Sequence, residues 1–530
     1  MVASQPPPPR GSARATLVVM LGIGVSRIFG LVREQVVAFY FGRSAAYSAF
    51  VAAYRVPNLV RVLLGEGNLS ASFIPVLAGK MAAGDEAEAR RLSRGVMGLL
   101  LAVVAVLTLA GMVAAPGLAW LVAPGFDPGL RSLVARLIVI LFPTMGFMVI
   151  GAWCMGVLHA HGRFLWPNLA PLFWSLSSAG ALVAFVGRVD MDPVYILAWG
   201  VVVGSALQLA VQLPATRAAL GTLAPGGGWR DPAVRKVIGL FVPMLLGTGV
   251  VALSTLIDVQ IATFLEEGSV ATLAYAQRLY LLPMSLFGVA IAQVALPTLA
   301  HDAARAGERV GAELGLSWRR MSFLMIPAAV GLAAFGRPAV SLLFERGRFD
   351  VTDTTAVTRV LAAYAIGLLA YGAVRLFATA FYAFQDTRTP VRVAVVALGV
   401  NVALGITLAW LVGTPGIALA TAAAAIVNAI LLGALLRRRM GRLFPGSAGA
   451  DAGRMAGAAA VAGALAVLPY RWVLARWPEW GLAARILGTA GLYGGIALAY
   501  WIGARALGVD ETRRVWERIR QRRGRARSAP

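Results

Sequence analysis

The chain has 530 residues, of which 59% are hydrophobic and only 14% are charged. This composition excludes an ordinary soluble domain and is typical of a protein that crosses a membrane many times. The net charge of +24 could suggest nucleic-acid binding, but most of the 48 lysines and arginines fall in loops on one side of the apolar segments. We therefore attribute the charge to membrane topology and expect no nucleic-acid partner.

Apolar windows of about 20 residues predict an all-α polytopic membrane protein with fourteen transmembrane helices. The predicted spans are 15–41, 46–79, 95–122, 132–158, 164–187, 193–213, 235–264, 271–299, 316–343, 357–384, 391–412, 416–436, 454–475 and 483–507. An even number of spans puts both termini on one side, and the excess of basic loop residues predicts that this side is the cytoplasm. No cleavable-signal pattern precedes the first span, so we expect that span to remain in the protein.

An internal repeat relates the first six spans to the next six. Similar residues recur at an offset of 222 or 223 in three separate places. Six spans per repeat preserve orientation, so we expect two six-helix bundles related by an axis along the membrane normal, around a central cavity. The matching pairs are 71–78 with 293–300, 53–55 with 276–278, Ala160 with Ala383, and Pro167 with Pro390.

The repeat predicts the domain organisation. Two extra C-terminal helices fall outside it, and no extramembrane stretch is long enough for a separate soluble domain. The expected parts are a cytoplasmic N-terminal tail (1–14), an N-terminal six-helix bundle (15–213), a cytoplasmic linker (214–234), a C-terminal six-helix bundle (235–436), a cytoplasmic loop (437–453), the extra helices (454–507) and a basic cytoplasmic tail (508–530).

Arginines inside the first two spans are the strongest functional signal. Arg27, Arg33, Arg55 and Arg61 lie in apolar segments, where an arginine at the centre of a span costs at least about 2.5–3.5 kcal/mol. Such residues usually face a protein interior or a water-filled path. Guanidinium groups bind phosphate oxygens in bidentate fashion, so several of them around one cavity predict an anionic substrate.

The spacing of these arginines predicts irregular helices. The two arginines in each span are six residues apart, which is about 240° of rotation on a straight helix. An interruption at Gly30 would bring the first pair to one face. The second span would be about 50 Å long if it were straight, which is too long for one crossing. We expect it to bend near Pro57 or at Gly65–Gly67.

Structural roles stay open for some of these residues. Arg33 and Arg55 could be anchors whose charged ends reach the periplasmic interface. Arg27 could instead pair only with Glu34, as a structural ion pair that stabilises the protein and does not contact substrate. Arg278 and Arg61 are stronger candidates, because both repeats present an arginine in their second helix.

Other polar residues have two interpretations each. Glu66, between two glycines, could contact substrate or pair with Arg61 at a helix end. His159 and His161 lie in a short cytoplasmic turn without a third ligand, so we predict no metal site there. We also expect no organic cofactor.

Asp258 is the one acid in the seventh span and falls near the repeat equivalent of Glu34. A buried carboxylate must be paired or neutralised. Asn401 and Thr421, in the eleventh and twelfth spans, could complete a monovalent-cation site with it, for Na⁺ or H⁺. A simple interhelical hydrogen bond is the alternative.

Four groups of segments form recognisable motifs: 26–34 (Ser-Arg-Ile-Phe-Gly-Leu-Val-Arg-Glu), 57–61 with 65–70 and 73–75, 275–279 with Pro283 and Pro297, and 385–390 (Gln-Asp-Thr-Arg-Thr-Pro). They resemble the signature segments of the MurJ/MviN-type lipid II flippases, which belong to the MOP exporter superfamily. The fourteen spans in a six-plus-six-plus-two plan agree, so the resemblance covers nearly the whole chain.

The resemblance implies a transporter, not an enzyme. It would move lipid II, the undecaprenyl-pyrophosphate-linked peptidoglycan precursor, across the bacterial inner membrane by alternating access, without ATP hydrolysis. The family's essential arginines carry over to Arg27, Arg33, Arg61 and Arg278, and helices 13 and 14 would form a groove for the lipid tail. We expect a monomer in contact with membrane lipids; contact with the cell-wall synthesis machinery stays open.

The chain departs from the family pattern at two places, and other functions predict different residues. Gln277 stands where an acid often precedes the arginine, and Ser48 stands where some relatives have Asp. A flippase for another polyprenyl-diphosphate-linked saccharide, of O-antigen or teichoic type, is the close alternative. A multidrug exporter would need an acidic cavity, and a glycosyltransferase would need paired carboxylates on a large aqueous loop. A non-transporting scaffold would not need arginines within the membrane.

Overall fold

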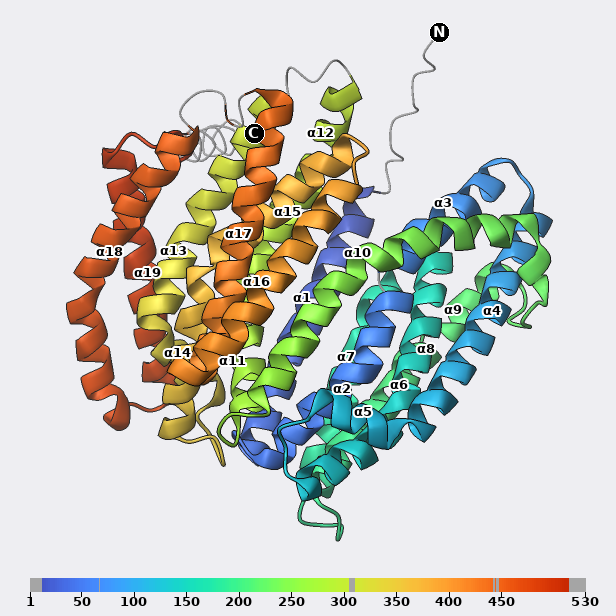
Figure 1. Ribbon diagram of the computed structural model, residues 1–530, viewed down its shortest axis with the longest axis horizontal. Helices are drawn as coiled ribbons and strands as arrows, with labels where there is room; N and C mark the ends of the chain where they lie inside the picture. The colour runs from blue at the N-terminus through green and yellow to red at the C-terminus, as the bar shows by residue number, and fades with distance from the viewer. Residues whose placement is uncertain (1–11, 66, 305–309, 442–443, 445–447, 514–530) are drawn as a thin grey trace, which may run out of the picture. The chain divides into compact units, whose positions relative to one another are not determined.

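The computed structural model describes residues 12–65, 67–304, 310–441, 444 and 448–513, which are helical with connecting turns and contain no strand (Figure 1). The elements are α1 (Ser12–Phe41), α2 (Ala45–Leu64), α3 (Asn68–Ala82), α4 (Glu86–Val113), α5 (Ala115–Val122), α6 (Pro128–Ala160), α7 (Leu165–Phe185), α8 (Pro193–Ala210), α9 (Leu213–Leu220), η1 (Gly228–Arg230), α10 (Pro232–Ala262), α11 (Ser269–Pro283), η2 (Met284–Val289), α12 (Ala290–Ala304), α13 (Val310–Phe344), α14 (Val351–Ile366), α15 (Leu368–Ala383), α16 (Arg388–Val412), α17 (Thr414–Met440), α18 (Ala448–Arg476), η3 (Trp477–Glu479) and α19 (Leu482–Ala506).

Helices occupy all fourteen ranges predicted to span the membrane. Among the described residues, eleven helical segments are long and apolar enough to cross a bilayer, or twelve if α14 and α15, bent by 42°, form one span. The other two ranges hold α1 and α10, helices of 30 and 31 residues. The all-α, multi-span prediction is therefore confirmed. Helices are expected here because a backbone in hydrocarbon must satisfy its own hydrogen bonds.

Three of the long helices begin with the same Asp-Pro pair. Asp127, Asp192 and Asp231 precede the prolines that start α6, α8 and α10, and their carboxylates accept backbone N–H groups two residues further on, at 2.8, 3.0 and 2.8 Å. The carboxylate satisfies a backbone donor that the first helical turn leaves unpaired, and proline fits the first helical position because it has no N–H to lose.

The chain divides into two compact units. The first comprises Met1–Val270 with Arg346–Phe349, and the second comprises Ala271–Glu345 with Asp350–Pro530. α10 begins the second repeat in sequence, but it packs on α2, α3, α4 and α5 and so belongs to the first unit. The units therefore divide after α10, whereas the repeat divides before it.

The helix boundaries repeat with the offset seen in the sequence. The segment formed by α14 and α15 begins and ends 223 residues after α6, and α16 begins 223 residues after α7. α6 is one continuous helix, while its counterpart is bent between Ile366 and Leu368. The repeat is thus present in the structure as an order of elements, with local differences.

Each unit has its own packing. In the first unit, Tyr47, Phe73 and Trp153 are among the largest side chains that are fully buried. In the second unit, α18 and α19 lie beside each other and pack on α13 (Figure 1). Trp477, after α18, donates its indole N–H to the hydroxyl oxygen of Ser341 on α13 at 2.8 Å.

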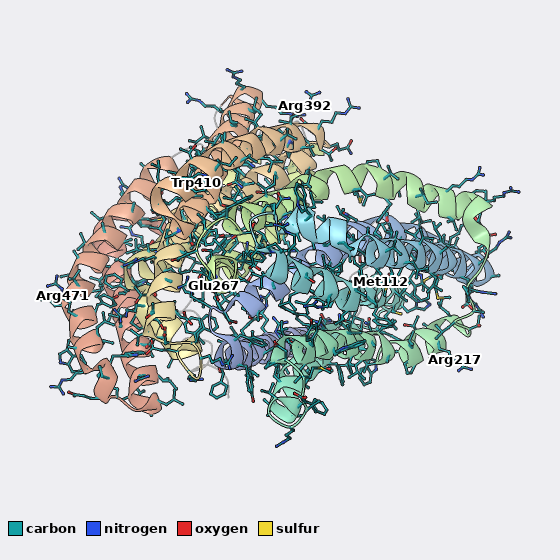
Figure 2. The ribbon with its side chains drawn as sticks, turned by 60° about the horizontal axis from the view of Figure 1, so that its bottom comes forward. Met112, Arg217, Glu267, Arg392, Trp410 and Arg471 are labelled. Carbon is teal, nitrogen blue, oxygen red and sulfur yellow. The ribbon has the colours of Figure 1, made fainter. Side chains whose placement is uncertain are left out.

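The distribution of side chains along the helices fits a membrane protein. Arg217 and Arg471 lie near the C-terminal ends of α9 and α18, and Arg392 lies in the first turns of α16 (Figure 2). Trp410, near the other end of α16, is 72% exposed. Charged residues at helix ends and exposed tryptophans near them are the pattern expected at the two membrane interfaces.

Candidate functional site

The first candidate arginines lie on α1, which is not interrupted. The helix runs from Ser12 to Phe41 without a break at Gly30, so the prediction of an interruption there is wrong. A glycine inside a helix costs only about 1 kcal/mol, less than breaking backbone hydrogen bonds within a membrane. Arg27 and Arg33 consequently leave α1 in directions about 240° apart. The Arg27 side chain is exposed, whereas that of Arg33 is only 14% exposed.

Arg33 is held by a carboxylate and an aromatic ring of the first unit. Its guanidinium pairs with the carboxylate of Glu34, and its Cζ lies 4.0 Å from the ring centroid of Trp174 on α7. Glu34 is itself buried, so the pair neutralises a carboxylate that would otherwise be costly to bury. A cation over an indole face contributes about 0.5–2 kcal/mol. This enclosure does not fit the interpretation of Arg33 as an interfacial anchor.

A row of aromatic rings leads to this arginine. Phe41, Tyr47, Phe50, Tyr54 and Trp174 stack in that order, with successive ring centroids 5.8, 6.1, 6.1 and 6.3 Å apart. The row joins the end of α1 to one face of α2 and to α7. Each aromatic pair contributes about 0.5–1.5 kcal/mol beyond its buried area, so the row stabilises the packing of the face of α2 on which Tyr54 lies.

The predicted bend in the second span falls at its glycines. α2 continues through Pro57 and ends at Leu64, and α3 begins at Asn68. Gly67 has φ +81°, a conformation that side-chain-bearing residues rarely adopt. The Asn68 amide donates to the carbonyl oxygen of Leu63 at 3.0 Å, across the break. The helix is therefore interrupted at Gly65–Gly67 and not at Pro57, although α2 and α3 together still count as one candidate span. Glu66 lies outside the described residues.

Arg61 lies in the last turn of α2, just before this break. Its Nε donates to the side-chain oxygen of Asn58 at 3.0 Å, which restricts the orientation of the guanidinium. Arg55 is partly buried on the same helix. The helix between Arg55 and Arg61 is unbroken, so these two side chains also leave it in different directions.

The second unit carries Arg278 on α11. Arg278 is partly buried, and the nearby ring of Tyr280 stacks on Tyr364 at 4.8 Å and on Tyr371 at 5.3 Å. These rings tie α11 to α14 and α15. Arg278 is the tenth residue of α11, and Arg55, its repeat counterpart, is the eleventh of α2. The two arginines therefore lie at matching levels of matching helices.

The counterpart of the glycine break is a π-helical segment. α11 ends at Pro283, and Met284–Val289 form π-helical turns before α12 begins. Shifted back by the repeat offset, this segment corresponds to residues 61–66. π-Helical turns inside α-helices occur frequently at functional sites. Pro283 was part of a motif in the sequence, but no residue pattern there predicts π-helical turns.

The candidate ion-coupling residues fall in different units. Asp258, on α10, is buried in the first unit. Asn401, on α16, is buried in the second unit, and Thr421, on α17, donates to the carbonyl oxygen of Ile417 at 2.9 Å. α16 and α17 pack along each other. Within the part of the chain that the structure describes, no three His, Cys, Asp or Glu side chains form a group that could hold a metal ion.

The second unit contains an ionic cluster that the sequence did not predict. Arg319 on α13 lies 3.6 Å from Asp451, 3.8 Å from Asp510 and 3.4 Å from Glu511, and Asp451 also pairs with Arg454 at 3.2 Å. The cluster joins α13 to α18 and to the segment after α19. The acids lie more than 130 residues from Arg319 in the chain, so no local pattern could have indicated the contact.

Comparisons with known proteins agree with this architecture. The family model described as Lipid II flippase MurJ matches residues 37–488. A relative from Vibrio cholerae, named probable lipid II flippase MurJ, is 34% identical over 486 residues, which are 89% of this chain and 91% of that protein.

Two solved structures share the fold. The structure titled Lipid II flippase MurJ, inward closed conformation, has a TM-score of 0.74 at 23% identity and covers 92% of this chain and 99% of its own. An inward-facing multidrug resistance MATE family transporter of the MOP superfamily has a TM-score of 0.65 at 15% identity and covers 80% of this chain and 98% of its own. At these identities the matches establish the fold alone.

Proposed function

The chain belongs to the lipid II flippase MurJ family, and we propose that it moves lipid II from the cytoplasmic to the periplasmic leaflet for peptidoglycan synthesis. The family match over 37–488 is the observation that carries this proposal. The protein is then a transporter and not an enzyme. Alternating access without ATP hydrolysis is the mechanism we propose for it.

The membrane arrangement that we propose has fourteen crossings in the bacterial inner membrane, with both termini in the cytoplasm. Helices in all fourteen predicted ranges support it, as does the excess of basic residues in the loops on one side. We propose a monomer that contacts membrane lipids and uses no organic cofactor.

Arg27, Arg61 and Arg278 are the residues that we propose to bind the diphosphate of lipid II. An arginine binds phosphate oxygens with charge-assisted bonds of fixed geometry. Arg27 is exposed on its helix, and Asn58 orients the guanidinium of Arg61. Arg33 is already paired with Glu34, so we assign it a positioning role.

Arg55 and Glu66 complete the set of substrate-binding candidates. Arg55 shares the level of Arg278 in the repeat, which supports its inclusion. For energy, we propose that Asp258, with Asn401 and Thr421, couples transport to Na⁺ or H⁺. Burial of the Asp258 carboxylate supports an ion-dependent role, since such a group needs a counter-charge or a proton. Transport indifferent to both ions in wild type and in Asp258→Asn would contradict it.

The proposed function is tested by complementation of a flippase-depleted bacterium. The readout is growth together with the fraction of lipid II that a membrane-impermeant enzyme can cleave at the outer face. Wild type should restore both, and so should Arg392→Ala, which removes an exposed arginine from α16. Arg27→Ala, Arg61→Ala and Arg278→Ala should restore neither at equal protein level.

Two results would contradict the proposal. If all three alanine variants expose lipid II at the outer face as wild type does, these arginines do not bind the diphosphate. Failure of wild type to expose lipid II, together with export of a different polyprenyl-diphosphate-linked saccharide, would replace the substrate.

A further inference from the structure

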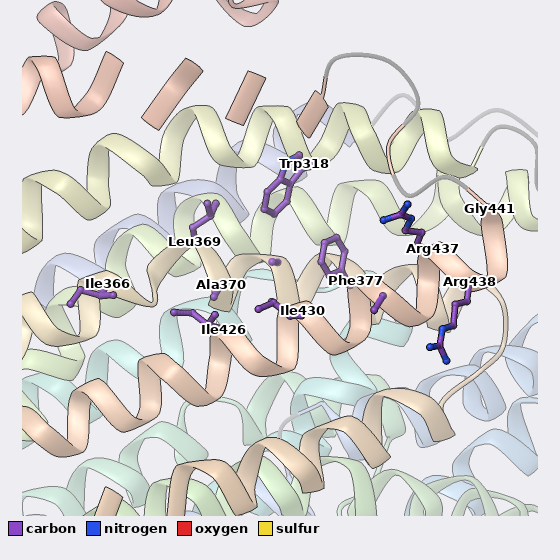
Figure 3. A pocket seen from close by; sticks show the side chains of 14 residues that line it. Trp318, Ile366, Leu369, Ala370, Phe377, Ile426, Ile430, Arg437, Arg438 and Gly441 are labelled. Carbon is purple, nitrogen blue, oxygen red and sulfur yellow. The ribbon is translucent and has the colours of Figure 1, made fainter. Parts of the chain in front are cut away.

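A groove in the second unit has no role in the mechanism described so far. It lies over α15, between α13 and α17, is open on one side, and has a volume of about 820 Å³. Figure 3 shows Ile366 at one end of the row of lining side chains and Arg437 and Arg438 at the other. The volume is in the range of sites that hold a single small ligand, roughly 300–1,000 Å³.

The floor and walls of the groove are apolar. Trp318 on α13 stacks on Phe377 on α15, with ring centroids 5.9 Å apart. Alanines on α15 and α17 leave the recess open because their side chains are short, and Ile430 is 63% exposed along it. Apart from the indole of Trp318 and the two arginines, the lining offers no polar side chain. Its apolar floor therefore suits a hydrocarbon chain, and its few polar groups, the two arginines in particular, lie at one end.

One end of the groove is cationic. Arg437 and Arg438 are exposed in the last turn of α17, and neither forms an ion pair or a side-chain hydrogen bond with the residues that the structure describes. The next residue differs, because Arg439 pairs with Asp386 at 3.4 Å and covers the ring of Phe384 at 4.5 Å. Among the described residues, these two arginine charges therefore have no partner at this end of the groove.

We propose that this groove binds one anionic phospholipid of the cytoplasmic leaflet. An acyl chain lies along the apolar floor, and the phosphate accepts hydrogen bonds from Arg437 and Arg438. Basic pockets between membrane helices bind anionic headgroups in this way, and arginine–phosphate bonds are strengthened by charge. The positive-inside rule places this end of α17 on the cytoplasmic side. The ligand is a resident lipid and not the transported one.

The test measures lipid retention by the full-length protein. Wild type in detergent is mixed with equal amounts of phosphatidylglycerol and phosphatidylcholine, and the bound lipids are counted by native mass spectrometry. Wild type should keep one phosphatidylglycerol. Arg437→Gln with Arg438→Gln should lower its retention about tenfold or more, the effect of losing at least one charge-assisted contact. Arg388→Gln with Arg392→Gln removes equal charge near the start of α16, outside the groove, and should change nothing.

A second variant tests the apolar floor with both arginines intact. Ala429→Trp places a large ring in the groove and should also abolish retention of phosphatidylglycerol. Ala434→Trp, at an exposed position nearer the arginines, replaces it if that protein does not fold. Thermal unfolding in detergent verifies that each variant is folded.

Three outcomes would overturn the proposal. Equal loss in the Arg388/Arg392 control would mean general attraction of anionic lipid to a basic surface. If the folded tryptophan variants retain phosphatidylglycerol as wild type does, no acyl chain occupies the groove. Displacement of phosphatidylglycerol by equimolar undecaprenyl diphosphate would make the groove part of the substrate path.

Discussion

The second helix of each repeat loses α-helical geometry at the same level, but by different means. In the first repeat, α2 stops at Leu64 and a glycine with φ +81° turns the chain into α3. In the second repeat, α11 passes through the π-helical segment Met284–Val289 into α12. The level of the irregularity is therefore shared while the residues that create it are not. Irregular backbone in a membrane is tolerated where protein or a water-filled path satisfies it.

The two repeats also differ in charge near this level. The first has Arg55 and Arg61 before the break, whereas the second has Arg278 alone, and Met284 stands at the position equivalent to Arg61. Glu34 has Arg33 beside it, while Asp258, near the equivalent position, follows Ile257. The first repeat is the more cationic at this level, so we expect substitutions of its arginines to weaken diphosphate binding more than substitutions in the second repeat.

Arg61→Ala should have the largest effect of any change near the first break. Loss of a charge-assisted hydrogen bond costs about 1.5–3 kcal/mol, so we expect translocation to fall at least about tenfold. Arg61→Lys keeps the charge without the planar fork and should be intermediate. The measurement is the rate of lipid II exposure in membrane vesicles. An Arg61→Ala protein as active as wild type would show that the extra arginine of the first repeat has no role in transport.

Gly67→Val should have the second largest effect, because it places a β-branched residue at φ +81°. The left-handed conformation costs a side-chain-bearing residue about 1–2 kcal/mol, and we expect a loss of that size in the free energy of unfolding together with slower translocation. Gly67→Asn should be milder, since asparagine tolerates this region. Gly79→Val, in α3 with nothing within 4 Å of an added Cβ, is the control for β-branching in a helix. Equal effects at both positions would refute the role of the turn.

Trp174→Ala should release Arg33 and have a smaller effect. The stacking of a guanidinium on an indole contributes about 0.5–2 kcal/mol, and Trp174→Phe should keep part of it. The measurement is thermal stability in detergent, with and without the companion change Arg33→Gln. A double-mutant cycle that shows no coupling between positions 33 and 174 would contradict the contact.

Asp386→Asn should have the smallest effect and sharpens the comparison of α7 with α16. Asp386 accepts hydrogen bonds from the backbone N–H and hydroxyl of Thr389 at 3.0 and 2.8 Å, whereas its repeat counterpart before α7 is Arg163. The backbone bond from Thr389 is the main cause that lowers the pKa of Asp386 below its usual 3.8. A lowered pKa stabilises the folded protein above about pH 4, and the contribution disappears as the pH falls through the folded pKa.

The measurement for Asp386 is unfolding in detergent between pH 3 and pH 7. The free energy of unfolding of wild type should exceed that of Asp386→Asn near neutral pH by at most about 1 kcal/mol. This excess should disappear as the pH falls. A difference that grows toward low pH would contradict the assignment.

Much of the fold was predictable because apolar length is a direct physical signal. Helices lie in every predicted span, and α2 is interrupted at Gly65–Gly67, one of the two places where the excess length of this span predicted an irregularity. The prediction at Gly30 was wrong, because a lone glycine does not break a helix in hydrocarbon. The contact of Arg33 with Trp174 could not be predicted, since it joins residues far apart in the chain. The π-helical turns after Pro283 were missed because no residue type specifies them.

Binding of undecaprenyl diphosphate to the purified protein in nanodiscs tests the central claim most directly. The claim is that arginines from both repeats bind the diphosphate. Arg61→Ala in the first repeat and Arg278→Ala in the second should each weaken binding about tenfold or more, while Arg392→Ala should bind as wild type does. If both alanine variants bind with the affinity of wild type, the diphosphate is bound elsewhere and the account is wrong.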